Sequence, residues 1–256
     1  MAGAALLERL NIARTPIVWH TATVLEVVAE TFHASTIVLD VEGWPGHLAG
    51  QHVDVRLTAQ DGYQAQRSYS IASAPEDPRF ALTVERIDDG EVSPYLVGEA
   101  RPGDSFELRG PIGGHFVWRV EDGGPLLLIA GGSGLVPLMA MARHHAAQHS
   151  NIDLRLLVSA RSWDDVLYRE ELLAAAAQRE SVQLHLTLTR EQPPGWGGFD
   201  RRIDAQMLAA VGPSPAASPA VFVCGPTPFV ERAADLLVEA GHPAEAIRAE
   251  RFGPSG

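Results

Sequence analysis

The stretch PLLLIAGGSGLVPLMAMARHHAAQ, residues 125–148, joins two apolar runs through a glycine-rich turn. The first run is short and uninterrupted, as expected of a strand that is buried on both faces. The second is long enough for a helix, and Pro137 suits its first turn, where a missing N–H costs no hydrogen bond. The glycines interrupt the apolar character too early for a membrane span. We therefore predict a strand, a tight turn and a helix.

The turn contains Gly131, Gly132 and Gly134. Glycine lets the backbone approach a pyrophosphate, whose charge is then met by amide hydrogens at the helix N-terminus. The usual dinucleotide fingerprint is G-x-G-x-x-G, whereas here Pro137 stands in the third glycine position. The turn favours a dinucleotide site, and a purely structural turn is the alternative interpretation.

Strands and helices alternate after this stretch. Apolar strand-like runs at 152–161, 182–190 and 220–226 are interleaved with helical patterns at 164–178, 204–211 and 228–241. Such alternation predicts βαβ units, with a parallel sheet and helices on both of its faces.

The region before it has a different pattern. Six short, β-branched or alternating runs are separated by Gly, Pro and Asp turns, and they cover 21–30, 35–43, 52–59, 67–74, 80–87 and 104–111. Regular spacing of this kind predicts a six-stranded antiparallel β-barrel. The acidic, proline-bearing segment VEDGGP, 120–125, marks the boundary, so the predicted domains are 1–122 and 123–256.

Composition excludes several classes of function. The net charge of −12 argues against nucleic acid or an anionic membrane surface as the main partner. All 20 basic residues are arginine, which excludes Walker-A and Schiff-base lysine chemistry. The single cysteine, Cys224, allows no intrachain disulfide and no four-cysteine cluster, and we predict no metal site. Residues 1–14 contain Glu8 and make a poor signal peptide, so we expect a cytoplasmic protein.

The tip of the second parallel strand carries Ser159 and Arg161, and Arg190 ends the next strand. An acidic residue at that tip usually binds the ribose 2′-hydroxyl of NAD, whereas arginine accommodates a 2′-phosphate. The pattern favours NADPH over NADH. The alternative is that Ser162 and Asp165 form a capping box and that Arg161 is simply solvated.

Cys224 ends the last strand-like run of the parallel region, where open α/β sheets bind their ligands. It is either an inert buried thiol or part of a nicotinamide pocket.

The stretch QRSYSIASAP, 66–75, is unusually polar for a strand. Arg67 could hold a phosphate, Tyr69 could stack on a ring system and Ser70 could hydrogen-bond a ring nitrogen. Arg67 and Tyr69 share one face of the strand. Further along, Ser93 before Pro94 has the signature of a helix N-cap and of a second phosphate seat. The alternative is an exposed polar strand face.

The order of the motifs decides between these readings. The segments AGQHV, RSYS, GEVSPYL, RGPIGG, AGGSGLVP, SARSWDDVLYREEL, CGPTPFV and ERFG follow one another between residues 21 and 253. In this order the sequence resembles the ferredoxin–NADP⁺ reductase superfamily, in which a flavin-binding barrel precedes an NAD(P)-binding domain.

The resemblance implies a role for each motif. RSYS would bind the flavin phosphate and ring, with Ser70 near flavin N5, while the strand 84–87 and the loop after it would hold the flavin face and pyrophosphate. The glycine-rich turn would bind the nicotinamide dinucleotide, Cys224 and Gly225 would lie beside the nicotinamide, and the C-terminal segment with Phe252 would approach the flavin. The predicted cofactor-binding residues are Arg67, Ser68, Tyr69, Ser70, Val84, Glu85, Arg86, Gly90, Val92, Ser93, Gly132, Gly134, Pro137, Ser159, Arg161, Arg190, Cys224, Gly225 and Phe252.

The sequence therefore predicts a flavoenzyme that moves hydride from NAD(P)H to flavin, with Ser70 and Cys224 shaping the pocket. The family usually uses FAD, and FMN is the alternative. Electrons would pass to a separate ferredoxin, flavodoxin or oxygenase component, since one cysteine cannot build the plant-type [2Fe–2S] domain of many relatives, unless the sequence is part of a longer chain. A reductase of free flavin, ferric chelates or quinones is the first competing hypothesis, and a regulatory or bifurcating flavin subunit the second.

Overall fold

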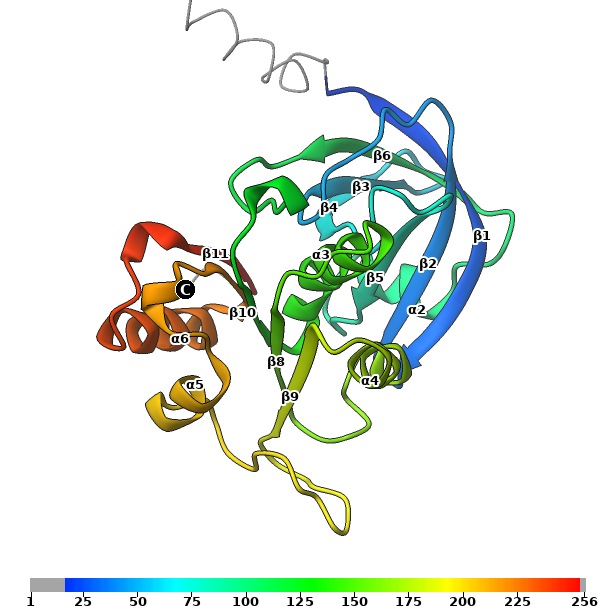
Figure 1. Cartoon of the computed structure of the whole chain (residues 1–256). Coiled ribbons are helices and arrows are strands. Elements are labelled where there is room, and N and C mark those ends of the chain that lie inside the picture. Colours follow the sequence, from blue (N-terminus) through cyan, green and yellow to red (C-terminus); the bar gives the residue numbers. More distant parts are fainter. Residues whose placement is uncertain (1–16, 254–256) are drawn as a thin grey trace, which may run out of the picture.

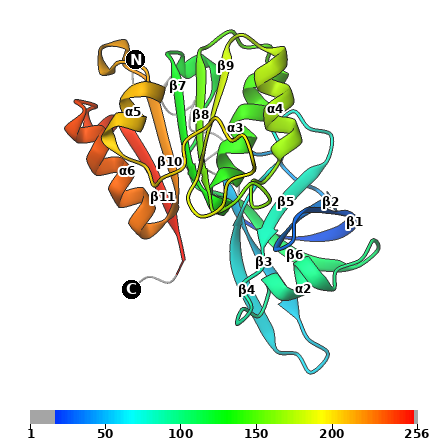
Figure 2. The same cartoon turned by 90° about the horizontal axis from the view of Figure 1, so that it is seen from below.

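Residues 17–253 are described by a computed structural model, so the segment 1–14 considered above lies outside them. The described chain forms one antiparallel and one parallel sheet (Figure 1). Figure 2 shows the antiparallel sheet and the parallel sheet side by side, with helices against both faces of the latter.

The antiparallel sheet is six-stranded, as predicted, and its strand order is β4-β3-β6-β1-β2-β5. Its edges approach each other beyond the end of β4, where Ile71 bridges Leu82 and the Ala72 N–H donates to the Ala81 carbonyl at 2.8 Å. This contact curls the sheet into a barrel. The strands are β1 (Trp19–Thr31), β2 (Ala34–Val41), β3 (His52–Thr58), β4 (Gln64–Ser70), β5 (Phe80–Glu85) and β6 (Ser105–Ile112).

The second sheet is parallel throughout, with the order β11-β10-β7-β8-β9. Its strands are β7 (Leu126–Gly131), β8 (Leu154–Ala160), β9 (Val182–Leu188), β10 (Ala220–Pro226) and β11 (Ile247–Phe252). Successive side chains of β7 enter opposite cores: Leu128 packs toward α3 (Leu135–Ala147) and α4 (Arg169–Gln178), and Ile129 toward α5 (Ala205–Val211) and α6 (Thr227–Glu239). The prediction of helices on both faces is confirmed, whereas β11 was not predicted.

One predicted helix start and one predicted N-cap are wrong. The helix expected from residue 164 begins at Arg169, because Ser162 donates to Asp165 within a turn, from its N–H at 3.0 Å and its hydroxyl at 2.7 Å. Helix α2 (Ser93–Gly98) begins as expected, but its N-cap is Val92, with no side-chain cap. The Ser93 hydroxyl instead accepts the Ile87 N–H at 3.0 Å.

The two sheets share a continuous core. Phe116 and Trp118, from the segment after β6, are buried against residues of the parallel sheet such as Phe222. Arg143 of α3 donates to the Ala72 carbonyl at 2.7 Å, and the Tyr168 hydroxyl donates to Thr83. The division at residue 122 stays a prediction, because this core crosses it. Between residues 17 and 253, no helix is long and apolar enough to cross a membrane.

Candidate functional site

The glycine-rich turn packs directly on the neighbouring strand. Gly132 has φ of 55°, in the left-handed region that favours glycine. A Cβ added to Gly134 would lie 2.2 Å from the Cys224 carbonyl oxygen of β10, so no side chain fits there. Pro137 is buried in the first turn of α3. At Gly132 the turn therefore offers its main chain directly to whatever lies above it, and Ser133 is the residue of the turn that adds a side chain.

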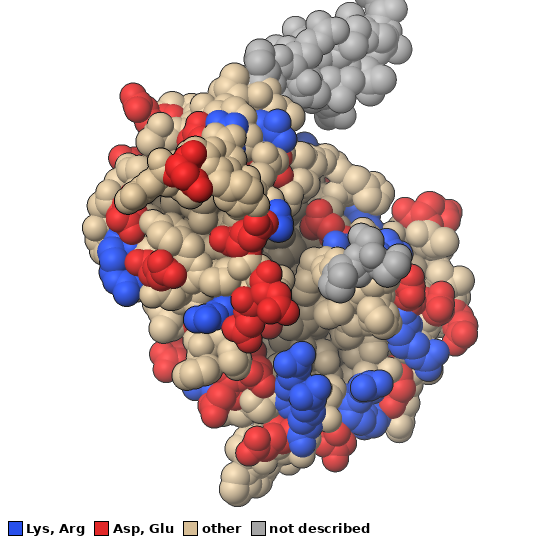
Figure 3. Space-filling model, turned by 180° about the vertical axis from the view of Figure 1, so that it is seen from behind, with Lys and Arg blue, Asp and Glu red and all other residues tan. Residues whose placement is uncertain are grey.

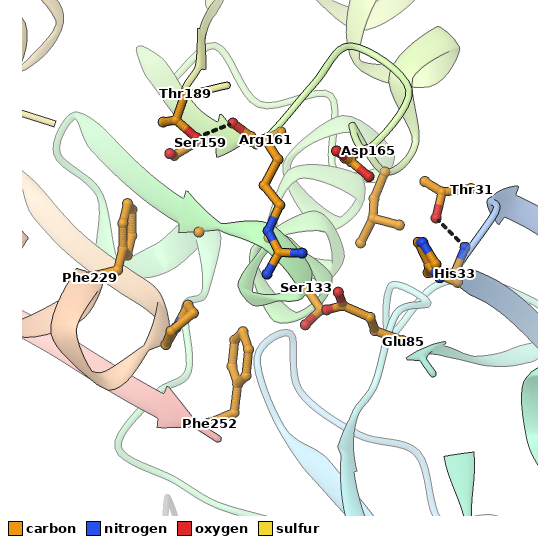
Figure 4. Close-up of a pocket in the computed structure, with 16 residues that line it drawn as sticks. Thr31, His33, Glu85, Ser133, Ser159, Arg161, Asp165, Thr189, Phe229 and Phe252 are labelled. Atoms are coloured by element: carbon orange, nitrogen blue, oxygen red, sulfur yellow. Dashed lines mark hydrogen bonds between the residues drawn. The ribbon is translucent and has the colours of Figure 1, made fainter. Parts of the chain in front are cut away.

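A cleft opens above this turn, between the parallel sheet and the barrel (Figure 4). The parallel sheet and its loops contribute Gly131, Ser133 and Arg161, while the barrel contributes His33 and Glu85. A ligand seated on the turn would thus contact both parts of the molecule.

Among the described residues, the arginine that lines this cleft is Arg161. Its guanidinium reaches into the cleft toward Ser133 and Glu85, with Ser159 and Thr189 beyond its backbone (Figure 4). Arg190 is not brought into the cleft: its side chain is exposed, and only its N–H meets Arg161, donating to the carbonyl at 2.9 Å. Asp165 also lines the cleft, a place that its sequence context did not predict.

The predicted flavin seat lies on the edge strand β4. Arg67 is exposed and already engaged, because its Nη2 donates to Glu91 Oε2 at 2.9 Å and its Nη1 to the Gln66 carbonyl at 2.6 Å. The Tyr63 hydroxyl also donates to Glu91. Tyr69 is half-buried on the same face as Arg67, and burial raises its pKa to about 12, which keeps the hydroxyl neutral. Sequence reasoning missed Glu91, although it stands inside the GEVSPYL motif.

The serines of β4 lie on its opposite face. The Ser68 hydroxyl donates to Asp54 at 2.7 Å, and Asp54 also accepts a hydrogen bond from Arg109 at 2.6 Å. Ser70 pairs with His52 of β3. Ser68 is therefore on the other side of the strand from Arg67 and Tyr69. Ser70 lies at the end of β4, next to the place where the barrel meets the parallel sheet.

The predicted site residues in β5 and in the loop after it differ in how far they are buried. Val84 and Val92 are fully buried in the barrel core, so their side chains are not free to touch a ligand. Arg86 is exposed and paired with Asp88 at 3.1 Å. Gly90 is tightly enclosed, because a Cβ there would lie 2.9 Å from the Ile87 carbonyl oxygen.

The ends of β10 and β11 complete the site. Cys224 is 3% exposed, and burial raises the pKa of its thiol far above the ordinary value, so it stays neutral and is no nucleophile. A Cβ on Gly225 would lie 2.9 Å from Phe229, which lines the cleft together with Phe252. Sequence reasoning missed Phe229, which follows the CGP segment.

Glu250 is a further residue that was missed. It pairs in register with Cys224, and burial raises its pKa to about 7. Its Oε1 lies 3.8 Å from Nδ1 of His52 on the barrel. Only the ERFG motif marked this position, because β11 was not predicted as a strand.

This donor set fits two nucleotide-type ligands. Backbone groups without side chains and an arginine suit the phosphates of a dinucleotide, and an exposed arginine near a half-buried tyrosine suits a flavin. Within residues 17–253, no three His, Cys, Asp or Glu side chains gather as metal ligands would.

Two family models match the chain, and they divide it as the sheets do. "Oxidoreductase FAD-binding domain" matches residues 36–118, and "Oxidoreductase NAD-binding domain" matches residues 128–235. Ferredoxin–NADP reductase B of Sorangium cellulosum is 34% identical over 214 residues, which cover 80% of this chain and 84% of that one. The chain belongs to the ferredoxin–NADP⁺ reductase superfamily. It is an FAD-dependent NAD(P)H oxidoreductase of this superfamily, as predicted.

Other members of the superfamily are similar over most of the chain. The glycine betaine monooxygenase reductase subunit of Pseudomonas aeruginosa is 31% identical over 210 residues, covering 80% of this chain and 56% of the relative. The chain thus spans little more than half of that protein. The structure of Amycolatopsis cytochrome P450 reductase GcoB has a TM-score of 0.81 at 27% identity, covering 94% of this chain and 72% of GcoB. The FAD/NAD-binding domain of nitric oxide dioxygenase from Vibrio cholerae shares the fold, with a TM-score of 0.81 at 24% identity, covering 92% and 99%.

Proposed function

We propose that this chain accepts hydride from NADPH onto bound FAD and passes the electrons singly to a separate redox protein, such as a ferredoxin, a flavodoxin or an oxygenase component. The observation that carries the proposal is the cleft lined by both parts of the molecule. A nucleotide seated on the glycine-rich turn would extend toward β4 and β5 of the barrel, where the flavin seat is predicted.

Each part of the site has a task in this proposal. FAD supplies the conversion of a two-electron donor into a one-electron donor, which side chains cannot perform. Arg67 would hold the flavin phosphate and Tyr69 would pack against the ring. The turn at Gly132 and Gly134 would hold the dinucleotide pyrophosphate. The neutral Cys224 and the ring of Phe252 would exclude water from the place where the two rings meet. These tasks are binding and alignment, which is what hydride transfer needs from a protein.

The choice of NADPH rests on Arg161. Its guanidinium reaches into the cleft, and Ser159 lies beside the strand tip (Figure 4). A planar guanidinium binds phosphate through two parallel hydrogen bonds, which NADH, lacking the 2′-phosphate, cannot reproduce. Asp165 and Glu85 also line this cleft, and their carboxylates would repel the 2′-phosphate. They therefore limit how strongly the cleft can prefer NADPH over NADH.

The choice of a protein acceptor rests on the relatives and on cysteine content. The similar proteins named above include a monooxygenase reductase subunit, a ferredoxin–NADP reductase and a cytochrome P450 reductase. The 256 residues hold one cysteine, so a four-cysteine cluster cannot form within them, and in this proposal the electrons pass to a centre outside these residues. Acidic side chains and arginines are interspersed over the face shown in Figure 3, which would suit a partner of mixed charge. We propose the cytoplasm as the location.

One observation favours a second candidate, a reductase of free flavin, ferric chelates or quinones. The exposed Arg67 is paired with Glu91, so a flavin phosphate must compete with a carboxylate for it. Because this competition would weaken flavin binding, the reduced flavin could leave the protein and carry the electrons through solution.

The deciding experiment is an anaerobic titration followed by an acceptor screen. The purified protein is saturated with FAD or FMN, and flavin absorbance is followed as NADPH or NADH is added. We expect bleaching by NADPH at lower concentrations than by NADH. Turnover is then compared with ferredoxins, flavodoxin, cytochrome c and free flavins. A protein that takes up neither flavin rules out the proposal, and turnover with free flavin alone supports the second candidate.

A further inference from the structure

The loop 161–168, which joins β8 to α4, forms one wall of the cleft through Arg161, Asp165 and Leu167. Its first part continues from β8 and contains the hydrogen-bonded turn at Asp165. Its last residue, Tyr168, contacts the barrel instead. The position of this wall therefore depends on how Tyr168 is held.

Tyr168 combines an unfavourable backbone conformation with a buried side chain. Its φ of 52° lies in the left-handed region, which is uncommon for a bulky residue. The side chain is buried, and its hydroxyl donates to Thr83 of β5 in the barrel. Burial raises the pKa of Tyr168, so the hydroxyl keeps its proton and remains a donor. Such a conformation persists only where the surrounding contacts fix it, and for Tyr168 the barrel supplies part of them.

Tyr168 closes a cycle of hydrogen bonds with three residues of the barrel. Its hydroxyl donates to Thr83, whose hydroxyl lies 2.7 Å from that of Thr36 on the neighbouring strand β2. The Thr36 hydroxyl donates to Glu30 Oε1 at 2.6 Å, and Glu30 Oε2 accepts the Tyr168 N–H at 3.3 Å. The hydrogen-bond cycle therefore begins and ends at Tyr168, and its other members come from β1, β2 and β5.

The direction of each bond in the hydrogen-bond cycle is fixed. A carboxylate can only accept, so the Thr36 proton is directed to Glu30 and the Thr83 proton is directed to Thr36. The Thr83 oxygen then accepts from Tyr168, which is the bond observed. The cycle thus needs an acceptor at residue 30 and a donor at residue 168, and changing either group opens it.

Each member of the hydrogen-bond cycle stands within two positions of a residue that lines the cleft. The pairs of cycle member and cleft residue are Glu30 and Thr31, Thr36 and Ala34, Thr83 and Glu85, and Tyr168 and Leu167. Asp165 of the loop lies on a different side of the cleft from Thr31 and Glu85 of the barrel (Figure 4). The cycle thus joins the two walls of the cleft without itself lining it, and opening it would change their separation while every group that touches a ligand stays in place.

We propose that Tyr168 and Glu30 are positioning residues for the coenzyme, which hold the two walls of the cleft at the separation that NAD(P)H requires. This inference rests on the proposed function, because the coenzyme is the ligand concerned. The hydrogen-bond cycle lies outside β4, where the flavin seat is predicted, and it is separate from Arg161, to which we assign the 2′-phosphate. It therefore governs how tightly either coenzyme binds, and not flavin binding or the choice between NADPH and NADH.

Arg143 of α3 supports Tyr168 independently of the hydroxyl. Its guanidinium carbon lies 4.8 Å from the centre of the Tyr168 aromatic ring. It also donates to the Ala72 carbonyl of the barrel at 2.7 Å and to both carboxylate oxygens of Glu171 in α4, at 2.9 and 2.7 Å. Tyr168→Phe keeps these contacts and removes only the donor of the hydrogen-bond cycle.

The experiment separates coenzyme binding from flavin reduction in the FAD-loaded protein. Anaerobic stopped-flow reduction at increasing NADPH or NADH gives an apparent Kd and a limiting rate. Tyr168→Phe and Glu30→Gln should each raise the apparent Kd for both coenzymes by on the order of fivefold, as expected for one lost hydrogen bond. The limiting rate should stay close to that of the wild type, because only binding is affected. Since either change opens the same cycle, the double variant should bind coenzyme about as weakly as each single variant.

Glu76→Gln is the matched control. Glu76, in the loop between β4 and β5, also joins the barrel to α3, through His144 and Gln148 at 2.7 Å each. None of these three residues lines the cleft. The control should leave the apparent Kd for both coenzymes at the wild-type value, and a rise equal to that of Glu30→Gln would reveal a general loosening of the contact between barrel and parallel sheet and overturn the inference.

An unchanged apparent Kd in Tyr168→Phe and Glu30→Gln also overturns the inference, as do effects of the two substitutions that add in the double variant. If Tyr168→Phe does not fold, Glu30→Gln carries the same test against Glu76→Gln. A wild type that neither coenzyme reduces overturns the proposed function and the inference with it. A wild type that is reduced, with variants of unchanged apparent Kd, overturns the inference alone, so the two failures are distinguishable.

Discussion

The two predicted ligand sites of this molecule are built from different parts of the polypeptide. The dinucleotide turn uses main chain that is fixed by the core: Gly134 lies against the Cys224 carbonyl so closely that no Cβ fits. The predicted flavin seat uses side chains of an edge strand, and its central arginine, Arg67, is exposed and paired with Glu91. The main chain of the first site is already held by packing on β10, whereas a phosphate bound by Arg67 in the second would replace its ion pair with Glu91.

This difference determines how each site should respond to substitution. A site made of main chain is sensitive to added atoms, because any side chain collides with the fold itself. A site made of exposed side chains loses affinity when those groups are removed or altered, whereas changes to exposed charge pairs have little effect on the stability of the fold. The four predictions below, from the largest expected effect to the smallest, test this contrast.

Gly134→Ala should have the largest effect. Its Cβ would stand 2.2 Å from a backbone oxygen of β10, so the turn or the strand must shift. We expect a loss of unfolding free energy on the order of 3 kcal/mol, measured by urea denaturation, together with loss of NADPH binding. Gly114→Ala is the control, since no atom lies within 4 Å of its Cβ position. Equal stability of the two variants would contradict a turn fixed by the core.

Arg161→Ala tests the one side chain that we assign to coenzyme choice in the main-chain site. Loss of a bidentate phosphate contact should raise KM for NADPH roughly thirtyfold, or about 2 kcal/mol, and should leave KM for NADH nearly unchanged. Arg190→Ala is the matched control, because that side chain is exposed outside the cleft. Equal effects on both coenzymes would remove the 2′-phosphate assignment.

Tyr69→Ala addresses the ring of the flavin seat. Loss of an aromatic contact should weaken flavin binding roughly tenfold, measured by fluorescence titration. Tyr69→Phe retains the ring and removes only the hydroxyl. Weaker binding by the Phe variant would shift the role from the ring to the hydroxyl.

The same contrast explains what could be read from the sequence. Strands, helices and the glycine turn were predictable because hydrophobic periodicity and glycine record main-chain requirements directly. Helix starts and caps were less predictable, because the Ser162 and Ser93 hydroxyls form hydrogen bonds within turns instead of capping the helices. Glu91 and Glu250 were missed, because their significance comes from Arg67 and His52, which contact them across strands that are distant in sequence. A side-chain site depends on such pairings, and a single sequence does not record them.

Glu91→Gln should have the smallest effect and is the most direct test of the flavin seat. The Glu91 carboxylate accepts a hydrogen bond from Arg67 Nη2 at 2.9 Å. If a flavin phosphate took its place on Arg67, the carboxylate would still lie close to that phosphate. Removing the charge should therefore tighten flavin binding by roughly two- to fivefold at low salt, a gain that fades as salt screens the site. Titration of flavin fluorescence at two ionic strengths measures both quantities.

The control for this substitution is Asp88→Asn, which removes a carboxylate from the same loop but pairs with Arg86 instead of Arg67. It should leave flavin affinity within the error of the titration. If Glu91→Gln instead weakens flavin binding, the carboxylate orients Arg67 for the phosphate and does not compete with it. The flavin seat would then be pre-organised like the dinucleotide turn, and the case for an exchangeable flavin would lose its main support.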